Sequence, residues 1–465
     1  MCSFLVTTKI VTTDELLSAN KLQQFRGPDN TSITTINSVT FLHNLLSITG
    51  DFKVQPFISD DVVAIYNGEI YNYKELYPSS TSDGDCIIPT YLQYGEKFIE
   101  KFDGEFAIVL YDFKNQRIIF GLDTFGCKPL FYSLKDGIHF SSYKSALINL
   151  NINQIIQAGG NEYFLYDITK NKLYKEQLTA FDVDNEHKTN FNDWNDAFTS
   201  SVLKRGISSK PVMMGVSEGY DSGAICCGMV VNNIEFKMFS INVLPTISNV
   251  LSWRHNNVTV PIPAIENTPI YPPDIKNKVL LNPSYVDHII LNRKLYDKCE
   301  PYEYEFLNHK TNKVETKICR DTYGFLGAGF ILSLAKQEGY RICLTGLAGD
   351  VIGNPDINNW IREHKNLNCS IEGWALNNSV YSCECCSGIH GIEMRYPFLD
   401  KKLWQETLWL DKNIYIKPKS PQRQYMLNRN FPFVDINSAG QEIHEKVGFD
   451  RELPRVIKRI IYNIK

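Results

Sequence analysis

The chain has 465 residues and a formal net charge of -4, with 48 basic and 52 acidic residues dispersed along it. A polypeptide of this length exceeds what one hydrophobic core usually holds, so we expect two domains. The balanced charge predicts no special attraction to nucleic acid or to anionic membranes. No apolar run approaches the ~18–20 residues that span a bilayer, and the N-terminus lacks a basic stretch followed by a long apolar core. We therefore expect a soluble, intracellular, cytoplasmic protein with no nucleic-acid or membrane partner.

The 12 cysteines are spread over the chain beside a full hydrophobic complement, which is typical of reduced thiols in a cytosolic protein. One group offers enough ligands for a tetrahedral zinc ion, although its spacing lacks the regular C-x-x-C pairs of known zinc modules. Plain buried thiols are therefore the favoured interpretation, and zinc is the alternative. The group consists of Cys369, Cys383, Cys385 and Cys386, with His390 nearby.

Cys2 directly follows the initiator methionine. A small residue at this position usually allows Met1 to be removed, which exposes a cysteine with a free α-amine. That amine, with an unperturbed pKa of about 7.7–8.0, can accept the thiol proton and leave a thiolate nucleophile. A disordered terminal residue is the alternative. The segments that follow decide between the two.

Short alternating strands with few helices follow Cys2, and they predict stacked sheets with helices outside. One apolar strand, over residues 62–66, is expected to end in a polar Asn67-Gly68 turn. Several motifs occur in order: CSF at 2–4, RGPD at 26–29, QP at 55–56, YNGEIYN at 66–72, DGD at 83–85, DGEFAI at 103–108 and LDTFGCKPLFY at 122–132. Together they resemble the class II glutamine amidotransferase domain over roughly residues 1–170.

This resemblance implies a four-layer αββα glutaminase domain of the Ntn type, placed at residues 1–180. Cys2 would attack the side-chain amide of glutamine, and Asn67 with the Gly68 backbone N–H would stabilise the tetrahedral oxyanion. Glu69 and Asp83 stand where the family holds the α-amino end of glutamine.

One position departs from the family pattern. We align Asn44 with the arginine that pairs with the glutamine α-carboxylate in the family. Loss of a bidentate arginine should weaken glutamine binding, and the sequence leaves open whether Arg26 or another cation replaces it.

Residues 166–195 turn polar and lose apolar periodicity, so we place a linker near residues 175–190 and a second domain at 190–465. The stretch 212–228 then predicts a strand, a tight turn and a helix. Backbone N–H groups and the helix dipole in such a turn suit phosphate, while Asp221 offers a carboxylate to Mg²⁺ carrying phosphate oxygens. The Ser-x-Gly-x-Asp-Ser pattern resembles the pyrophosphate loop of enzymes that split ATP into AMP and pyrophosphate. An ordinary strand-helix turn is the alternative. The nucleotide-binding candidates here are Ser217, Gly219, Asp221 and Ser222.

A Pro- and Asn-rich stretch over residues 245–283 predicts loops or an insertion. A helical run over 322–337 follows, and then a buried strand over 341–345 that runs into a glycine turn. This second strand-then-glycine pattern predicts a doubly wound α/β nucleotide-binding domain with both turns at the carboxyl edge of a parallel sheet. Gly346 is then a nucleotide-binding candidate, and Asp350 joins Asp221 as a magnesium ligand. Helix capping is the alternative for both aspartates.

Two later motifs extend the resemblance. HGIEMRYPFLD at 390–400 and EKVGF at 445–449 are similar to segments of glutamine-dependent asparagine synthetases. Lys446 would be the cation that meets the phosphate and the reacting acyl centre, with a solvated surface lysine as the alternative. We assign Arg395 and Asp400 to structure, as a buried ion pair or cap. The run over 453–464 predicts an ordinary amphipathic helix.

The whole chain thus resembles a divergent glutamine-dependent asparagine synthetase, which implies glutamine, ATP and aspartate as substrates, Mg²⁺ as cofactor, and leaves a homodimer open. Alternatives are an amidotransferase for another carboxylate, or a divergent glutaminase or binding protein without ligase activity. The reason for keeping them is that Leu347 and Val351 replace two glutamates of the family, and Glu218 enters the pyrophosphate loop. We expect slow amide formation, a general base relocated to Glu393 or Glu218, or a different acceptor.

Overall fold

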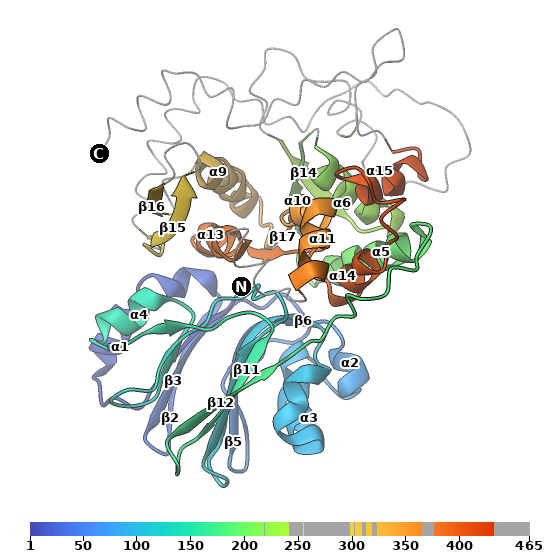
Figure 1. The fold of residues 1–465 in the computed structure, drawn as a ribbon. Helices are drawn as coiled ribbons and strands as arrows, with labels where there is room; N and C mark the ends of the chain where they lie inside the picture. Colours follow the sequence, from blue (N-terminus) through green and yellow to red (C-terminus); the bar gives the residue numbers. More distant parts are fainter. Residues whose placement is uncertain are drawn as a thin grey trace, which may run out of the picture.

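The computed structural model describes residues 1–217, 219–240, 254, 298–301, 303–308, 313–318, 323–364 and 376–431 (Figure 1). Several predicted features lie outside the described residues: Glu218, the stretch 245–283 apart from Arg254, Cys369, Lys446 and the run 453–464.

Two six-stranded antiparallel sheets form the N-terminal half of the chain. The first has the order β10-β8-β9-β1-β3-β2, and the second has the order β12-β11-β7-β6-β5-β4. The strands of the first sheet are β1 (Ser3–Thr7), β2 (Asn30–Ile36), β3 (Val39–Leu45), β8 (Phe131–Ser133), β9 (His139–Ser141) and β10 (Ile156–Gln157). Those of the second are β4 (Phe57–Ser59), β5 (Val62–Ile70), β6 (Gly104–Asp112), β7 (Arg117–Leu122), β11 (Glu162–Asp167) and β12 (Lys172–Gln177).

The two sheets stack face to face and helices cover their outer faces (Figure 1). Because side chains alternate along a strand, Phe4 and Val6 of β1 belong to the core between the sheets, whereas Leu5 belongs to the core under the helices. Helices α1 (Thr13–Asn20) and α4 (Lys144–Asn149) lie on the first sheet, and α2 (Tyr73–Leu76) and α3 (Ile87–Tyr94) on the second. The predicted αββα layering is confirmed.

The predicted turn at Asn67-Gly68 is wrong. β5 continues through both residues to Ile70, and Asn67 and Gly68 pair with Ala107 and Phe106 of β6. Gly68 has φ of +137°, and a Cβ on it would lie 2.0 Å from the carbonyl oxygen of Glu105. A glycine is therefore required here by the close approach of β6, and not by a change of chain direction.

A four-stranded parallel sheet with the order β14-β13-β17-β18 forms the centre of the C-terminal half. Its strands are β13 (Val212–Gly215), β14 (Phe236–Phe239), β17 (Ile342–Leu344) and β18 (Glu393–Arg395). The described helices around it are α5 (Asn192–Gly206), α6 (Tyr220–Val231), α9 (Tyr323–Gln337), α10 (Gly349–Ile352), α11 (Pro355–His364), α13 (Leu376–Gly388), α14 (Lys401–Leu408) and α15 (Ser420–Leu427). A hairpin of β15 (Glu303–Asn308) and β16 (Lys313–Ile318) lies beside α9 in Figure 1.

Helices lie on both faces of this sheet, with α9 and α13 on one side and α5 and α6 on the other (Figure 1). The expectation of a doubly wound α/β fold is therefore confirmed. From β13 the chain continues to β14 in one direction, and β17 and β18 extend the sheet in the opposite direction. The loops after β13 and β17 thus flank the point where strand order reverses, which is where such sheets bind ligands.

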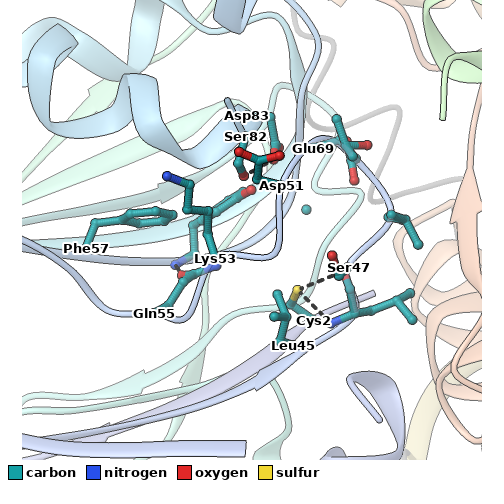
Figure 2. A pocket seen from close by; sticks show the side chains of 15 residues that line it. Cys2, Leu45, Ser47, Asp51, Lys53, Gln55, Phe57, Glu69, Ser82 and Asp83 are labelled. Carbon is teal, nitrogen blue, oxygen red and sulfur yellow. Dashed lines mark hydrogen bonds between the residues drawn. The ribbon is translucent and has the colours of Figure 1, made fainter. Parts of the chain in front are cut away.

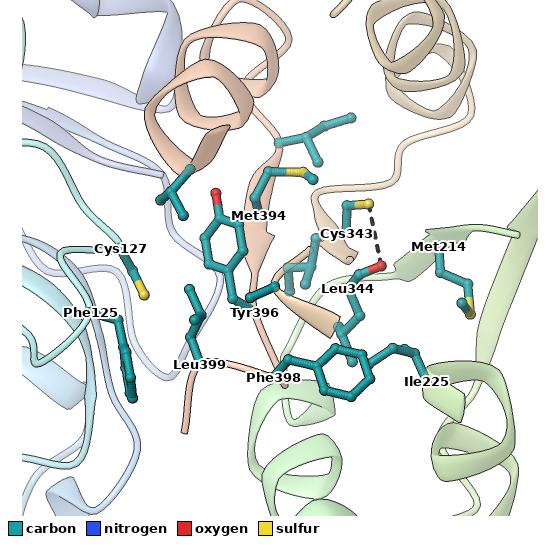
Figure 3. Close-up of a cluster of buried hydrophobic side chains, with 14 of the residues drawn as sticks. Phe125, Cys127, Met214, Ile225, Cys343, Leu344, Met394, Tyr396, Phe398 and Leu399 are labelled. Carbon is teal, nitrogen blue, oxygen red and sulfur yellow. Dashed lines mark hydrogen bonds between the residues drawn. The ribbon is translucent and has the colours of Figure 1, made fainter. Parts of the chain in front are cut away.

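Apolar side chains form one continuous core across the boundary between the two halves (Figure 3). Phe125 and Cys127 of the N-terminal half lie near Tyr396 and Leu399 in this cluster, and the Phe125 ring centroid is 5.7 Å from that of Trp404. Among the described residues, no helix combines the length and apolarity that crossing a bilayer requires.

Buried ion pairs cross the same boundary. Arg205 Nε of the C-terminal half lies 2.6 Å from Glu105 Oε1 of the N-terminal half, and Arg395 Nη2 lies 3.2 Å from Glu69 Oε1. Arg205 Nη1 also lies 3.0 Å from Asp400 Oδ2, within the C-terminal half. Asp400 also caps α14 by accepting hydrogen bonds from the backbone N–H groups of residues 402 and 403. Leaving one member of such a buried pair without its partner costs about 3–5 kcal/mol, so these contacts hold the two halves in one arrangement. The structural role predicted for Asp400 is confirmed.

Candidate functional site

Cys2 lies immediately before β1 and lines a pocket of about 340 Å³ (Figure 2). Its Sγ accepts a hydrogen bond from the backbone N–H of Leu46 at 3.4 Å. The pocket is lined by Cys2, Leu45, Leu46, Ser47, Ile48, Thr49, Asp51, Lys53, Gln55, Phe57, Tyr66, Gly68, Glu69, Ser82 and Asp83. Cys2, Gly68, Glu69 and Asp83, which the sequence assigned to one site, therefore line one cavity.

Met1 is fully buried, with its α-amine 3.9 Å from Glu393 Oε2. Burial lowers the pKa of this amine to about 6 and raises the pKa of the Cys2 thiol to about 12. Arg26 fixes the backbone here, because its Nε donates to the Cys2 carbonyl at 2.9 Å. The α-amine predicted as the proton acceptor of Cys2 becomes available only when Met1 is removed.

Asn67 is fully buried, and neither its side-chain nitrogen nor its side-chain oxygen has a hydrogen-bond partner. A buried polar group without a partner costs about 1–3 kcal/mol. An unpaired amide at this position, next to the pocket-lining Gly68, is therefore suited to donate to a ligand oxygen.

Glu69 and Asp83 are two buried carboxylates close enough to affect each other. Burial raises the pKa of Asp83 to about 6, although hydrogen bonds from Tyr66 and from the Ile70 N–H at 3.0 Å oppose the rise. Burial and the neighbouring Asp83 raise the pKa of Glu69 well above its usual value, while the guanidinium of Arg395, with Nη2 3.2 Å from Glu69 Oε1, acts in the opposite direction. Such a pair attracts a cationic ligand group, since a positive charge between the carboxylates favours their ionised forms.

Asn44 does not face this pocket. Its side-chain nitrogen donates to Ser3 Oγ at 2.9 Å and to Asn20 Oδ1 at 2.7 Å, on the side of β3 away from Cys2. The next residue, Leu45, lines the pocket instead. The expectation that position 44 meets the glutamine α-carboxylate is therefore wrong, because neighbouring residues of a strand point to opposite faces and Asn44 points away from the pocket. Arg26 does not replace it, because its guanidinium is directed at Cys2 and Glu384.

The second candidate site lies at the carboxyl edge of the parallel sheet. β13 and β17 are neighbours, so the loops that follow them meet as predicted. In the first loop, the Gly219 N–H donates to Ser217 Oγ and the Ser217 N–H donates to Ser222 Oγ, both at 3.1 Å. In the second loop, a Cβ on Gly349 would lie 2.4 Å from Asp221 Cγ.

Gly346 also approaches the first loop, since a Cβ on it would lie 3.1 Å from Asp221 Cβ. Gly346 and Gly349 of the second loop therefore lie in direct contact with Asp221, which follows the first loop. Arg254 Nη1 reaches the same loop and donates to the Gly219 carbonyl at 3.2 Å.

Lys419 joins the two aspartates that the sequence proposed as magnesium ligands. Its Nζ lies 2.6 Å and 2.7 Å from the Asp221 oxygens and 2.6 Å from Asp350 Oδ1. The two carboxylates thus converge on one position that a cation occupies, and this donor set suits Mg²⁺ together with phosphate oxygens. Lys419 has φ of +65°, an uncommon conformation for a residue other than glycine. No motif marked Lys419; the only available signal was its position between two prolines in Lys417-Pro418-Lys419-Ser420-Pro421.

Glu393 does not suit the role of relocated base. It pairs with Ile342 at the start of β18, whereas Arg395 pairs with Leu344 near the loop end of the same strand. Glu393 Oε1 accepts a hydrogen bond from Arg395 Nε at 2.7 Å. Burial alone would raise the pKa of Glu393, but the positive charges of Arg395 and of the nearby Met1 amine outweigh burial and lower this pKa. The structural role predicted for Arg395 is confirmed. Leu347, which replaces one of the family's glutamates, packs partly buried against the core.

Of the cysteine group, the described members Cys383, Cys385 and Cys386 lie on α13, and His390 follows this helix. Cys385 and Cys386 are buried, and burial lowers the pKa of His390 to about 4. Within the part of the chain that the structure describes, no cluster of three or more His, Cys, Asp or Glu side chains is arranged to hold a metal.

Comparisons with known proteins agree with this geometry. Residues 1–184 match the family described as "Glutamine amidotransferase domain". The chain is 24% identical over 439 residues to a putative glutamine-hydrolysing asparagine synthetase of Methanocaldococcus jannaschii, covering 85% of this chain and 73% of that protein. It is 24% identical over 450 residues to a probable asparagine synthetase of Schizosaccharomyces pombe, covering 89% and 76%. Asparagine synthetase B of Escherichia coli is 27% identical over 223 residues, covering 45% and 40%. The resemblance to glutamine-hydrolysing asparagine synthetases is confirmed.

Proposed function

We propose that the chain is a glutamine-hydrolysing, ATP-dependent amide ligase that converts aspartate, glutamine and ATP to asparagine, glutamate, AMP and pyrophosphate. The observation that carries the proposal is the pocket in which Cys2 lies together with the paired carboxylates of Glu69 and Asp83. The similarity to asparagine synthetases over 85–89% of the chain supports the ligase half.

In the first reaction, Cys2 attacks the side-chain amide of glutamine after Met1 has been removed. The freed α-amine takes the thiol proton and later returns a proton to the leaving ammonia. Asn67 and the Gly68 N–H hold the oxyanion, while Glu69 and Asp83 hold the α-ammonium group of glutamine. Water then releases glutamate from the thioester. The unpaired amide of Asn67 supports its part in this sequence.

In the second reaction, the loops after β13 and β17 bind ATP. The N–H groups around Ser217, Gly219 and Ser222 suit the phosphates, and Gly346 permits the close approach of the second loop. Asp221 and Asp350 would hold Mg²⁺, which neutralises the charge on the pyrophosphate leaving group. In this scheme Lys419 turns from the two aspartates to a phosphate oxygen when Mg²⁺ and ATP bind. Lys446 would be a second cation, which meets the phosphate and the reacting acyl centre.

Ammonia must pass from Cys2 to the acyl centre without being protonated by water. The apolar cluster that crosses the boundary between the halves supports a dry route, because it includes Cys2 and continues to the strands β13, β17 and β18 of the parallel sheet. Buried free thiols at Cys86, Cys127, Cys226 and Cys227 support a reducing compartment such as the cytoplasm.

The test is to incubate the protein with ATP, magnesium, glutamine and aspartate and to measure AMP, glutamate and asparagine together. Equal amounts of AMP and asparagine, with at least as much glutamate, are expected. Glutamate without AMP would refute the ligase half, and AMP that requires a carboxylate other than aspartate would refute the acceptor.

A further inference from the structure

The charges that line the pocket of Cys2 are unequal in number. Three carboxylates, those of Asp51, Glu69 and Asp83, line it together with one cation, Lys53, among the described residues. Glutamine carries one α-ammonium and one α-carboxylate group at neutral pH. Glu69 and Asp83 suit the ammonium group, so the carboxylate requires a positive partner at the same mouth of the pocket.

Other buried cations near Cys2 are already engaged and do not line the pocket. Arg26 donates to Cys2 O and Glu384. Lys128 donates to Glu384 Oε1 at 3.1 Å and to the Met394 carbonyl at 2.7 Å. Both are held by buried charged contacts, because turning either side chain into the pocket would remove one of the two buried cations that pair with Glu384.

Lys53 is held much less firmly. Its Nζ lies 3.7 Å from Asp85 Oδ2, and its side chain is 39% exposed. Asp85 has other partners, because the same oxygen accepts from the Thr81 and Ser82 N–H groups at 2.8 Å and 3.0 Å. Lys53 can therefore leave Asp85 at little cost, since partly exposed ion pairs contribute only about 0–1 kcal/mol. In Figure 2 Lys53 lies beside Asp51 and Ser82, which line the same pocket.

We propose that Lys53 binds the α-carboxylate of the substrate amino acid and thereby selects glutamine over simple amides. The ammonium group of Lys53 would then face the α-carboxylate of glutamine, and the carboxylates of Glu69 and Asp83 would face its α-ammonium group. The apolar Leu45 lines the pocket without contributing charge. This inference rests on the proposed glutaminase activity.

The test measures ammonia release from glutamine by the wild type and by Lys53→Met, Lys53→Arg and the exposed control Lys114→Met. Lys53→Met should raise KM for glutamine roughly 10- to 100-fold with little change in kcat, as expected for loss of a charged hydrogen bond that acts in binding. Lys53→Arg should restore most of the affinity, and Lys114→Met should behave as the wild type.

Two inhibitors, each lacking one charged group of glutamine, test which of these groups Lys53 binds. Glutaramate, which lacks the α-amino group, should lose affinity for Lys53→Met in parallel with glutamine, whereas 4-aminobutanamide, which lacks the α-carboxylate, should keep its Ki. An unchanged KM in Lys53→Met, or an equal loss of affinity for both inhibitors in a variant with wild-type thermal unfolding, would overturn the inference. If Lys53→Met does not fold, Lys53→Gln takes its place with the same expectations. A wild type that releases no ammonia from glutamine would instead refute the proposed function itself.

Discussion

Arg395 of the C-terminal half forms a buried ion pair with Glu69, which we propose binds the α-ammonium group of glutamine, and removal of Arg395 should therefore shift the pH dependence of glutamine hydrolysis. Its Nη2 lies 3.2 Å from Glu69 Oε1, in a fully buried site. An opposite charge at this distance lowers a carboxyl pKa by about 1–3 pH units, which corresponds to about 1.4–4 kcal/mol. Arg395→Met should therefore raise the pKa of Glu69 further above its usual value.

The charge of the ligand group determines whether kcat/KM rises or falls with pH. The α-ammonium group of glutamine binds the ionised carboxylates, so kcat/KM should rise with pH as the pair formed by Glu69 and Asp83 loses its protons. Asp83, with a pKa raised to about 6, places the lower part of this rise in the mildly acidic range. In Arg395→Met the rise should move about 1–3 pH units upward, so that kcat/KM measured on the rising, acidic limb of the profile falls roughly 10- to 1000-fold.

The assay is the pH profile of kcat/KM for glutamate release, with thermal unfolding as the measure of folding. Because Arg395 also pairs with Glu393 at 2.7 Å, the matched control is Arg395→Met combined with Glu393→Gln, which leaves no orphaned carboxylate on β18. The double variant should recover stability and keep part of the shift, because the charge of Glu393, which it also removes, raises the pKa of Glu69 and Asp83. A folded double variant with the wild-type profile would show that Arg395 does not act on Glu69.

Four further variants test the remaining assignments. Cys2→Ala should abolish glutamine-dependent asparagine formation and leave the ammonia-dependent reaction, because the two chemistries use separate sites; loss of both or of neither would refute the nucleophile. Lys419→Met, which removes the cation between Asp221 and Asp350, should lower aspartate-dependent exchange of pyrophosphate into ATP roughly 100-fold and leave glutamate release unchanged; normal exchange would contradict a phosphate role. Ala348→Gly should raise the free energy of unfolding by about 0.5–1 kcal/mol, since Ala348 has φ of +70°, and denaturant titration showing no gain would contradict strain there. Leu347→Glu should raise the rate of asparagine formation if a missing proton acceptor limits it, because a general base commonly contributes ~10²–10⁴-fold; an unchanged rate would mean that chemistry at this loop is not limiting.

Motifs in the sequence predicted much of the glutamine pocket, because Cys2, Gly68, Glu69 and Asp83 occur in short runs whose order is characteristic of one domain. Strand-then-glycine patterns likewise predicted the meeting of the two loops, since parallel neighbours bring their carboxyl ends to one edge. Both inferences depended on local patterns and on general rules of sheet topology.

The errors and omissions concern tertiary contacts. Asn44 was assigned to the wrong face because only the register of β1 against β3, with Ser3 opposite Asn44, decides which residue of β3 faces Cys2. The sequence predicts a turn at Gly68, but a glycine is needed there because the carbonyl of Glu105 on the neighbouring strand β6 lies too close for a side chain. Glu105 is far from Gly68 in sequence, so no local pattern indicates this contact. Lys53 and Lys419 are isolated lysines whose partners come from other segments, so no spacing rule could select them.

One strand, β18, contacts both proposed sites. Arg395 holds Glu69 in the glutamine pocket through its side chain, and its backbone carbonyl accepts the N–H of Thr345, the residue before Gly346 in the second nucleotide loop, at 3.0 Å. A shift of β18 would therefore alter the charge environment of Glu69 and the start of the nucleotide loop together. Because the buried ion pairs of Arg205 with Glu105 and of Arg395 with Glu69 resist separation of the two halves, the structure favours transfer of ammonia within one fixed assembly. Glu69 of this pocket thus has its buried ion-pair partner, Arg395, in the C-terminal half, which predicts that residues 1–184 expressed alone would hydrolyse glutamine more weakly than the whole chain.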